Sequence, residues 1–261
     1  MAIENSFAIL GESVSPIVMQ VYVIVMVLFV AGGTLFDILH KQSARYFFRD
    51  WRSAQERGTG TVGGGTVVSL AARTAASEVL TSSEFCNARR RAAHLLTMYG
   101  FLLYVVTTVV MVFGYPTKAT ATPEFLPVLW AIGAAMVCVG GYWFWFFIRA
   151  DVSAEGHSPF RIIRADLFIL SLLASTTLGL VWFFVQPGGG FWADLFLALY
   201  LIATTVLFGS IPWSKFSHMF FKPAAALQKR VNEANGTRRN LPAPADLPET
   251  LGSVPRQSNH Y

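Results

Sequence analysis

Five long runs of apolar residues divide the chain, and each is long enough to form a membrane-spanning helix. The runs cover residues 16–39, 92–114, 125–148, 167–185 and 191–211. At about 1.5 Å per residue, runs of about 19–25 residues can cross a hydrocarbon core about 30 Å thick. The pattern therefore predicts an all-α membrane protein, built as a five-transmembrane-helix bundle.

The polar connections between these runs predict the orientation of the bundle. All but Lys118 of the 20 Lys and Arg residues fall on one side once the five runs are drawn as spans. Because cytoplasmic flanks collect Lys and Arg, the basic connections mark the inside. We therefore expect the N-terminus outside, the C-terminus in the cytoplasm, and residence in the cell inner (cytoplasmic) membrane.

The apolar runs also predict how the chain is divided. We expect an outer N-terminal segment at 1–15, a five-span membrane domain at 16–221 and a cytoplasmic tail at 222–261. A cytoplasmic loop at 40–91 interrupts the membrane domain. The tail is rich in Pro, Asn and charged residues, so we expect it to be largely disordered until it meets a partner.

The loop at 40–91 contains three short patterns. Aromatic and basic residues alternate at 45–52, which suits a helix that continues from the first span along the lipid headgroups. The glycine-rich stretch 58–65 is expected to break regular structure. Apolar residues then recur at helical spacing over 67–80, which predicts a short amphipathic helix.

Composition and charge narrow the class of protein. Hydrophobic residues make up 54% of the chain and charged residues only 13%, as expected for a bilayer protein. The net charge of +5 comes from the inner loops and tail, and indicates contact with anionic lipids rather than nucleic acid. Cys86 and Cys138 are two lone thiols, which favours neither a disulfide framework nor an iron–sulfur or zinc site. No segment outside the spans is large enough for a catalytic domain.

Histidines are the candidate cofactor ligands. His40, His94, His157 and His218 are each expected at the cytoplasmic end of a span or in a cytoplasmic loop, whereas His260 lies in the tail. Axial ligation of haem needs two imidazoles from different elements. His94 at the start of the second span and His218 after the fifth could provide them. A solvated or lipid-facing side chain is the alternative for each histidine.

Several stretches resemble one known family of membrane proteins. Residues 85–101 combine a cysteine, three arginines, a histidine and a Gly-Phe pair at the entry to the second span. Residues 213–218 and 222–225 follow the fifth span, and 140–143 and 160–167 flank an inner loop. Together they resemble the five-helix cytochrome b membrane subunits of the nitrate reductase gamma, heterodisulfide reductase and quinone-interacting oxidoreductase type. The chain looks most like the membrane anchors of dissimilatory adenylylsulfate reductase.

The resemblance implies a cofactor and its ligands. In that family, the histidine that starts the second helix and the one that ends the fifth ligate the haem nearest the cytoplasm. His94 and His218 match these positions, which implies that they hold the iron of one haem b. Some members bind an outer haem through a deeper histidine pair. The corresponding spans here offer Tyr104 and Tyr200 instead, so we expect no outer haem.

The depth of His218 tests this interpretation at the sequence level. From Phe191 to His218 an uninterrupted helix would rise about 40 Å, which places His218 just beyond the hydrocarbon core. A tilt of the span, or a bend at Pro212, would bring it back toward the level of His94.

The functional hypothesis is a non-catalytic membrane anchor subunit that links a cytoplasmic oxidoreductase to the quinone pool by electron transfer. By resemblance, the partner is a flavin and iron–sulfur enzyme of sulfur metabolism, adenylylsulfate reductase, and quinone is the exchangeable substrate. One alternative is a haem-free docking anchor for the same kind of reductase. Another is a small transporter subunit, against which the spans show no internal repeat and no paired charges.

Charged residues beside the histidines have two interpretations each. The arginines at 89–91 could bind haem propionates or an acidic partner, or could anchor the second helix at the inner leaflet. Asp37, in the last turn of the first span, could handle protons at a quinone. The alternative for Asp37 is a side chain that caps the helix end or snorkels toward water.

Overall fold

The computed structural model of the chain describes residues 4–40, 43–82, 85, 87–149, 160–163, 166–213 and 218–237. Every regular element in these ranges is a helix. Five helices are long and apolar enough to cross a membrane, which confirms the predicted five-span, all-α class. They are α2 (Pro16–His40), α5 (Ala88–Gly114), α6 (Phe125–Trp143) with its π-helical end η2 (Phe144–Ile148), α7 (Leu167–Val185) and α8 (Gly190–Gly209). Which end faces the cytoplasm stays a prediction from the charge pattern.

The chain forms two compact units. The span unit comprises Met1–Asp37 and Asn87–Ser217, and therefore holds almost all of the five spans. The small unit comprises Ile38–Cys86 and His218–Tyr261. The predicted cytoplasmic loop and the start of the predicted tail thus belong to one folded unit.

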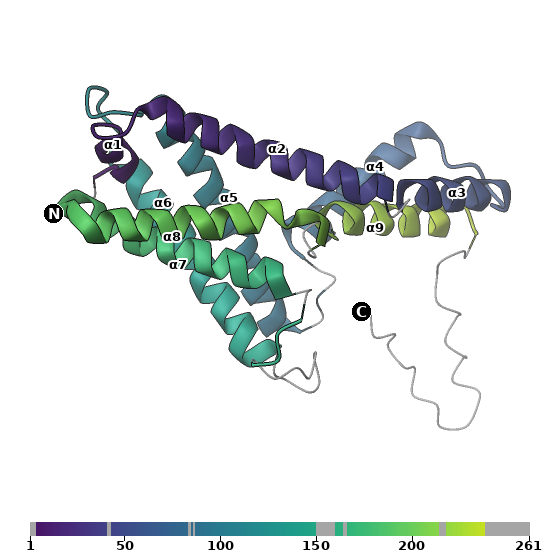
Figure 1. Ribbon diagram of the computed structural model, residues 1–261. Helices are drawn as coiled ribbons and strands as arrows, with labels where there is room; N and C mark the ends of the chain where they lie inside the picture. Colours follow the sequence, from purple (N-terminus) through teal and green to yellow (C-terminus); the bar gives the residue numbers. More distant parts are fainter. Residues whose placement is uncertain are drawn as a thin grey trace. The chain divides into compact units, whose positions relative to one another are not determined.

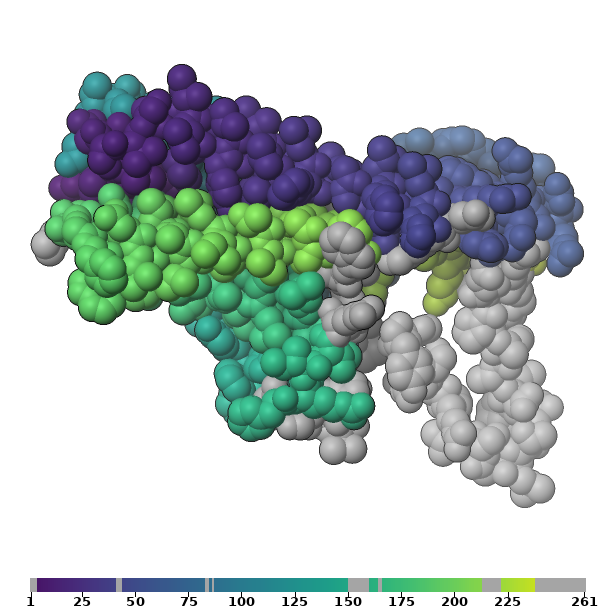
Figure 2. Space-filling model, viewed as in Figure 1, coloured from purple at the N-terminus to yellow at the C-terminus, as the bar shows by residue number. Residues whose placement is uncertain are grey.

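In the span unit, helices that are consecutive along the chain pack side by side. α6 contacts α5 and α7, and α7 contacts α8 (Figure 1). α2 lies along α8 on the face shown in Figure 2, where the hydroxyl of Tyr22 donates a hydrogen bond to the Leu201 carbonyl at 2.9 Å. The other side of α2 exposes apolar side chains such as Ile17, Val21 and Leu28, as expected for a lipid-facing helix.

A short helix that the sequence did not predict closes one end of the span unit. It is α1 (Ser6–Leu10), and the Asn5 side chain caps it by accepting hydrogen bonds from the backbone N–H groups of Phe7 and Ala8. The Asn5 amide also donates to the Tyr115 carbonyl at 3.1 Å, just past the end of α5. Ser6 donates to the Phe183 carbonyl in the last turn of α7 at 2.6 Å. Residues 5–10 of the predicted outer segment therefore form a packed cap that joins several helix ends.

Glycine allows α5 and α6 to approach closely. A Cβ atom added to Gly133 would lie 2.7 Å from the Tyr104 nitrogen and 2.9 Å from the Gly100 oxygen. A Cβ atom on Gly100 would lie 2.7 Å from the Gly133 oxygen. These are backbone atoms, which cannot rotate away as a side chain can, so the contact depends on small residues in both helices.

Gly133→Ala is therefore expected to push α5 and α6 apart and to lower the free energy of unfolding by about 1–3 kcal/mol. Gly32→Ala in α2 is the matched control, because no atom lies within 4 Å of its added Cβ. Unfolding in mixed detergent micelles with increasing SDS measures both variants. Equal stability of the two variants would contradict the close contact.

The small unit is built around α9 (His218–Ala234), which contacts α3 (Ser43–Glu56), α4 (Gly64–Thr74) and the π-helix η1 (Ala75–Leu80). Arg230 donates to the Glu78 carboxylate at 2.9 Å, and the Asn235 amide donates to the Ala54 carbonyl at 3.3 Å. Helix formation over 64–80 confirms most of the predicted amphipathic helix, although Gly64 and Gly65 already belong to it. Residues 222–234, which we placed in the disordered tail, are helical here, and 238–261 lie outside the described residues.

Candidate functional site

His94 lies near the start of α5, where a helix cap and close packing against α6 hold the backbone in place. The Asn87 side chain caps the helix by accepting hydrogen bonds from the N–H groups of Arg89 at 2.9 Å and Arg90 at 3.3 Å. Beside His94, Ala93 and Thr97 pack on α6 so tightly that a Cβ on Gly140 would lie 2.6 Å from each of them. The His94 side chain is half-buried.

The orientation of His94 follows from helical periodicity. Phe101 is seven residues further along α5, almost two full turns, and therefore lies on the same side of the helix. Its ring centroid is 6.4 Å from that of Phe208 in α8. His94 thus lies on the side of α5 that faces α8, about 10 Å nearer the helix start than Phe101.

The fifth span does not continue as one helix to His218. α8 ends at Gly209, a 3-10 turn η5 (Ile211–Trp213) contains Pro212, and α9 begins at His218. The rise of about 40 Å expected for an uninterrupted helix therefore does not apply to this chain. Proline explains the break, because it lacks the N–H that would continue the helix.

His218 itself begins α9 in the small unit, and its side chain lies outside the described residues. The pairing of His94 with His218 therefore stays a prediction. His40 is exposed at the end of α2, whereas the predicted positions of His157 and His260 lie outside the described ranges. Among the described residues, no three His, Cys, Asp or Glu side chains converge as a metal cluster would require. A haem with two axial imidazoles needs only two protein ligands.

Asp37 is buried, with 1% of its surface exposed, so the interpretation that it snorkels toward water is wrong. One turn earlier, the Cβ position of Gly33 lies 3.1 Å from Ile211 and 3.2 Å from Pro212 of η5. The turn after α8 thus packs against the last turns of α2. A role of Asp37 in proton handling stays a prediction.

A buried ion pair, which the sequence analysis missed, closes the same end of the span unit. Arg149 follows η2, is 1% exposed, and donates to the Asp166 carboxylate at 2.6 Å and 3.3 Å. The guanidinium also donates to the Arg161 carbonyl at 2.7 Å and lies 4.3 Å from the centroid of the Trp145 ring. Asp166 accepts a further hydrogen bond from the Ile163 N–H at 2.9 Å.

This arrangement satisfies both charges and ties the end of the third span to the start of the fourth. Because the carboxylate accepts three hydrogen bonds and the guanidinium donates three and also contacts the Trp145 ring, burial of the pair is compensated. The signal in the sequence was a base, Arg149, and an acid, Asp166, that directly flank two apolar runs on the same side of the predicted bundle. Two further acids and two further bases lie between them, so the sequence alone leaves the pairing open.

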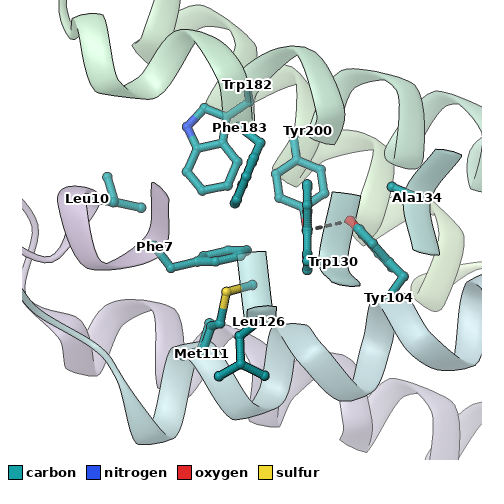
Figure 3. Close-up of a cluster of buried hydrophobic side chains, with 11 residues drawn as sticks. Phe7, Leu10, Tyr104, Met111, Leu126, Trp130, Ala134, Trp182, Phe183 and Tyr200 are labelled. Carbon is teal, nitrogen blue, oxygen red and sulfur yellow. Dashed lines mark hydrogen bonds between the residues drawn. The ribbon is translucent and has the colours of Figure 1, made fainter. Parts of the chain in front are cut away.

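Aromatic side chains fill the interior near the other end of the span unit (Figure 3). Trp130 stacks on Phe183 with ring centroids 4.4 Å apart, and Phe7 of the α1 cap lies edge-on to Trp182 at 5.0 Å. The Tyr104 hydroxyl donates to that of Tyr200 at 2.7 Å, as the dashed line in Figure 3 shows. Tyr104 and Tyr200 thus belong to a cluster of packed aromatic and aliphatic side chains inside the span unit.

Comparison with known proteins gives one distant similarity. No protein-family profile matches the chain, and no solved structure matches it. A stretch of 160 residues is 29% identical to the Escherichia coli protein named Citrate utilization protein B. The match covers 58% of this chain but only 40% of that protein, so the chain spans less than half the length of this relative. The resemblance to five-helix cytochrome b subunits stays a prediction.

Proposed function

We propose that this chain is the membrane anchor subunit of a quinone-linked oxidoreductase complex in the inner (cytoplasmic) membrane. It docks a cytoplasmic flavin and iron–sulfur oxidoreductase, and electrons pass between that enzyme and quinone through one haem b. His94 and His218 are the axial ligands of the haem iron. The observation that carries the proposal is the position of His94, half-buried in the first turns of α5 on the side that faces α8.

The length of the chain after Phe208 supports the second ligand. Phe208 lies at the level of Phe101, and His218 is ten positions further along the chain. Ten residues span about 15 Å as helix and about 33 Å when extended. His94 is about 10 Å from that level along α5, so the interrupted segment is long enough for His218 to reach it.

The donor set suits a haem better than a free metal ion. Two neutral imidazoles from non-adjacent helices are the usual axial ligands of electron-transfer haem in helical bundles. A haem b bound there would carry single electrons. The close contact of its neighbours Ala93 and Thr97 with α6 would fix the orientation of the helix segment that carries His94.

The arginines at 89–91 supply positive charge next to His94, in the first turn of α5. A helix N-terminus disfavours cations, because the backbone N–H groups there already carry positive partial charge. An anion near these side chains, such as haem propionate or an acidic surface of the partner enzyme, would offset this repulsion. Anionic headgroups of the inner leaflet would also offset the repulsion, if these arginines anchor the helix at the membrane surface instead.

Two candidates follow for the physiological reaction of the partner. The resemblance of the sequence stretches favours adenylylsulfate reductase and sulfur metabolism. The Escherichia coli relative is named for the use of citrate, which makes citrate metabolism the second candidate. In this proposal the anchor role of the chain is the same for both candidates, and only the substrate of the docked enzyme differs.

The two rival functions are a haem-free docking anchor and a small transporter subunit. In the first, redox centres of the partner reach quinone directly, and His94 and His218 are ordinary interface residues. Against the transporter, the Arg149–Asp166 pair lies at the ends of its two spans rather than at mid-membrane. Transport sites usually lie near the bilayer midplane.

Purification from native membranes in mild detergent tests the proposal. We expect a reduced-minus-oxidised spectrum with a b-type band, together with a co-purified flavin and iron–sulfur enzyme whose identity decides between the two reactions. A colourless preparation that retains the enzyme would favour the haem-free anchor. A colourless preparation with no redox partner would contradict the anchor role.

A further inference from the structure

Helix α3 has an apolar side and a basic side, and the small unit packs only the apolar side. Ala54 is fully buried, and its carbonyl accepts the hydrogen bond from Asn235 that follows α9. Phe47 and Trp51 precede Ala54 by seven and three residues, so all three lie on one side of the helix. Phe47 and Trp51 therefore share the side of α3 on which Ala54 is buried, and both are half-buried.

The opposite side of α3 presents a stripe of arginines. Arg45, Arg49 and Arg52 are spaced four and three residues apart, so they share one side of the helix, and all three are exposed. Two aromatic residues flank them, Tyr46 at 51% exposure and Phe48 at 59%. The guanidinium of Arg49 lies 4.9 Å from the centroid of the Tyr46 ring.

The covalent chain places the start of α3, where the stripe begins, near the membrane surface. α3 begins at Ser43, three residues after His40, the last residue of the span α2. Three residues extend at most about 10 Å, so the start of α3 stays within about 10 Å of the end of the span. That distance corresponds to the headgroup layer of a bilayer.

We propose that the arginine stripe of α3 binds the phosphate groups of anionic phospholipids in the leaflet where α2 ends. Arginine binds phosphate through paired N–H donors, and aromatic rings such as Tyr46 and Phe48 are favoured at the level of the headgroups. Bound lipid holds the small unit against the membrane surface. This inference is independent of haem binding and of the proposed electron transfer.

Energy transfer in nanodiscs tests the lipid site with the full-length chain. A donor fluorophore is attached through Gln55→Cys, an exposed position on α3, in a background with Cys86→Ser and Cys138→Ser. Headgroup-labelled lipid is the acceptor, in phosphatidylcholine nanodiscs with or without an equal part of phosphatidylglycerol. We expect transfer to rise with phosphatidylglycerol and the rise to shrink in high salt.

The double variant R49Q/R52Q is expected to lose the response. Each basic side chain near an anionic surface favours the bound state about fivefold, so two are worth about 25-fold. The matched control R57Q/R73Q removes the same charge from exposed positions off the stripe and should keep the response.

Three results would overturn the lipid site. The first is wild-type transfer that does not depend on phosphatidylglycerol. The second is an equal loss in both double variants, which would assign the effect to net charge alone. The third is a response to polyglutamate in phosphatidylcholine nanodiscs without one to phosphatidylglycerol, which would assign the stripe to a soluble acidic partner.

Discussion

Replacing His94 with Ala is expected to abolish the b-type band of the purified protein and, with it, electron transfer to quinone. His218→Ala should have the same effect, because haem b is held by its axial ligands and by packing without a covalent bond to the protein. Reduced-minus-oxidised spectra at equal protein concentration measure the loss. His40→Ala, at an exposed position at the end of α2, is the control and should keep the full band.

A second readout separates loss of a ligand from loss of the fold. In His94→Gly, added imidazole should restore part of the band, since the free ligand can occupy the space of the missing side chain. Under the haem-free alternative, quinone-linked activity survives both alanine substitutions. A full band in either alanine variant would remove that histidine from the site.

Replacing Arg149 with Leu is expected to lower the free energy of unfolding of the span unit by about 3–5 kcal/mol. The reason is that the Asp166 carboxylate would remain buried without the guanidinium that donates to it at 2.6 Å and 3.3 Å. The double variant R149L/D166L removes both charges and should recover most of the lost stability. Titration with SDS from mild detergent micelles measures all three proteins.

The Arg230–Glu78 pair provides the matched control for this prediction. It has a similar contact distance of 2.9 Å, but its two side chains are 21% and 22% exposed. Because solvent screens such pairs, Arg230→Gln should cost about 1 kcal/mol or less. If Arg149→Leu cost no more than Arg230→Gln, the buried pair would not hold the end of the third span to the start of the fourth.

The spans could be predicted from the sequence because lipid imposes a simple rule on them. Each helix must satisfy its own backbone hydrogen bonds and expose apolar side chains over the thickness of the bilayer. The second span was predicted to start at residue 92, but its helix starts at Ala88. Hydropathy alone cannot show this difference. Asn87 caps the helix, so the arginines that follow it are helical although they are not apolar.

Other parts of the structure depend on contacts between distant segments and could not be read from local patterns. α1 forms only five residues of helix, held by hydrogen bonds from Asn5 and Ser6 to residues more than a hundred positions away. The helix α9 lies in a stretch with ordinary tail composition, yet it packs against α3, α4 and η1. Its fully buried Val231 gives little signal by itself in the sequence.

The candidate site was predicted only in part. From the sequence, His94 and His218 were the candidate ligands, and an uninterrupted fifth span would place His218 beyond the hydrocarbon core. The span is interrupted between Gly209 and His218, so that distance does not apply, and the pairing of the two histidines stays a prediction. The Arg149–Asp166 pair was missed, because it depends on which helix ends lie side by side. For Asp37 two interpretations were open, and its burial excludes only the one in which it snorkels toward water. Pairing of charges across a bundle end requires knowledge of helix neighbours, which periodicity does not supply.

The most direct test of the central claim is the haem content of the purified chain. A pyridine haemochrome assay, combined with electron paramagnetic resonance of the oxidised protein, reports the amount of haem b and its axial ligands together. The account predicts one haem b per chain with the low-spin signal of two histidine ligands. A haem-free protein that still supports quinone-linked activity in its complex would contradict it.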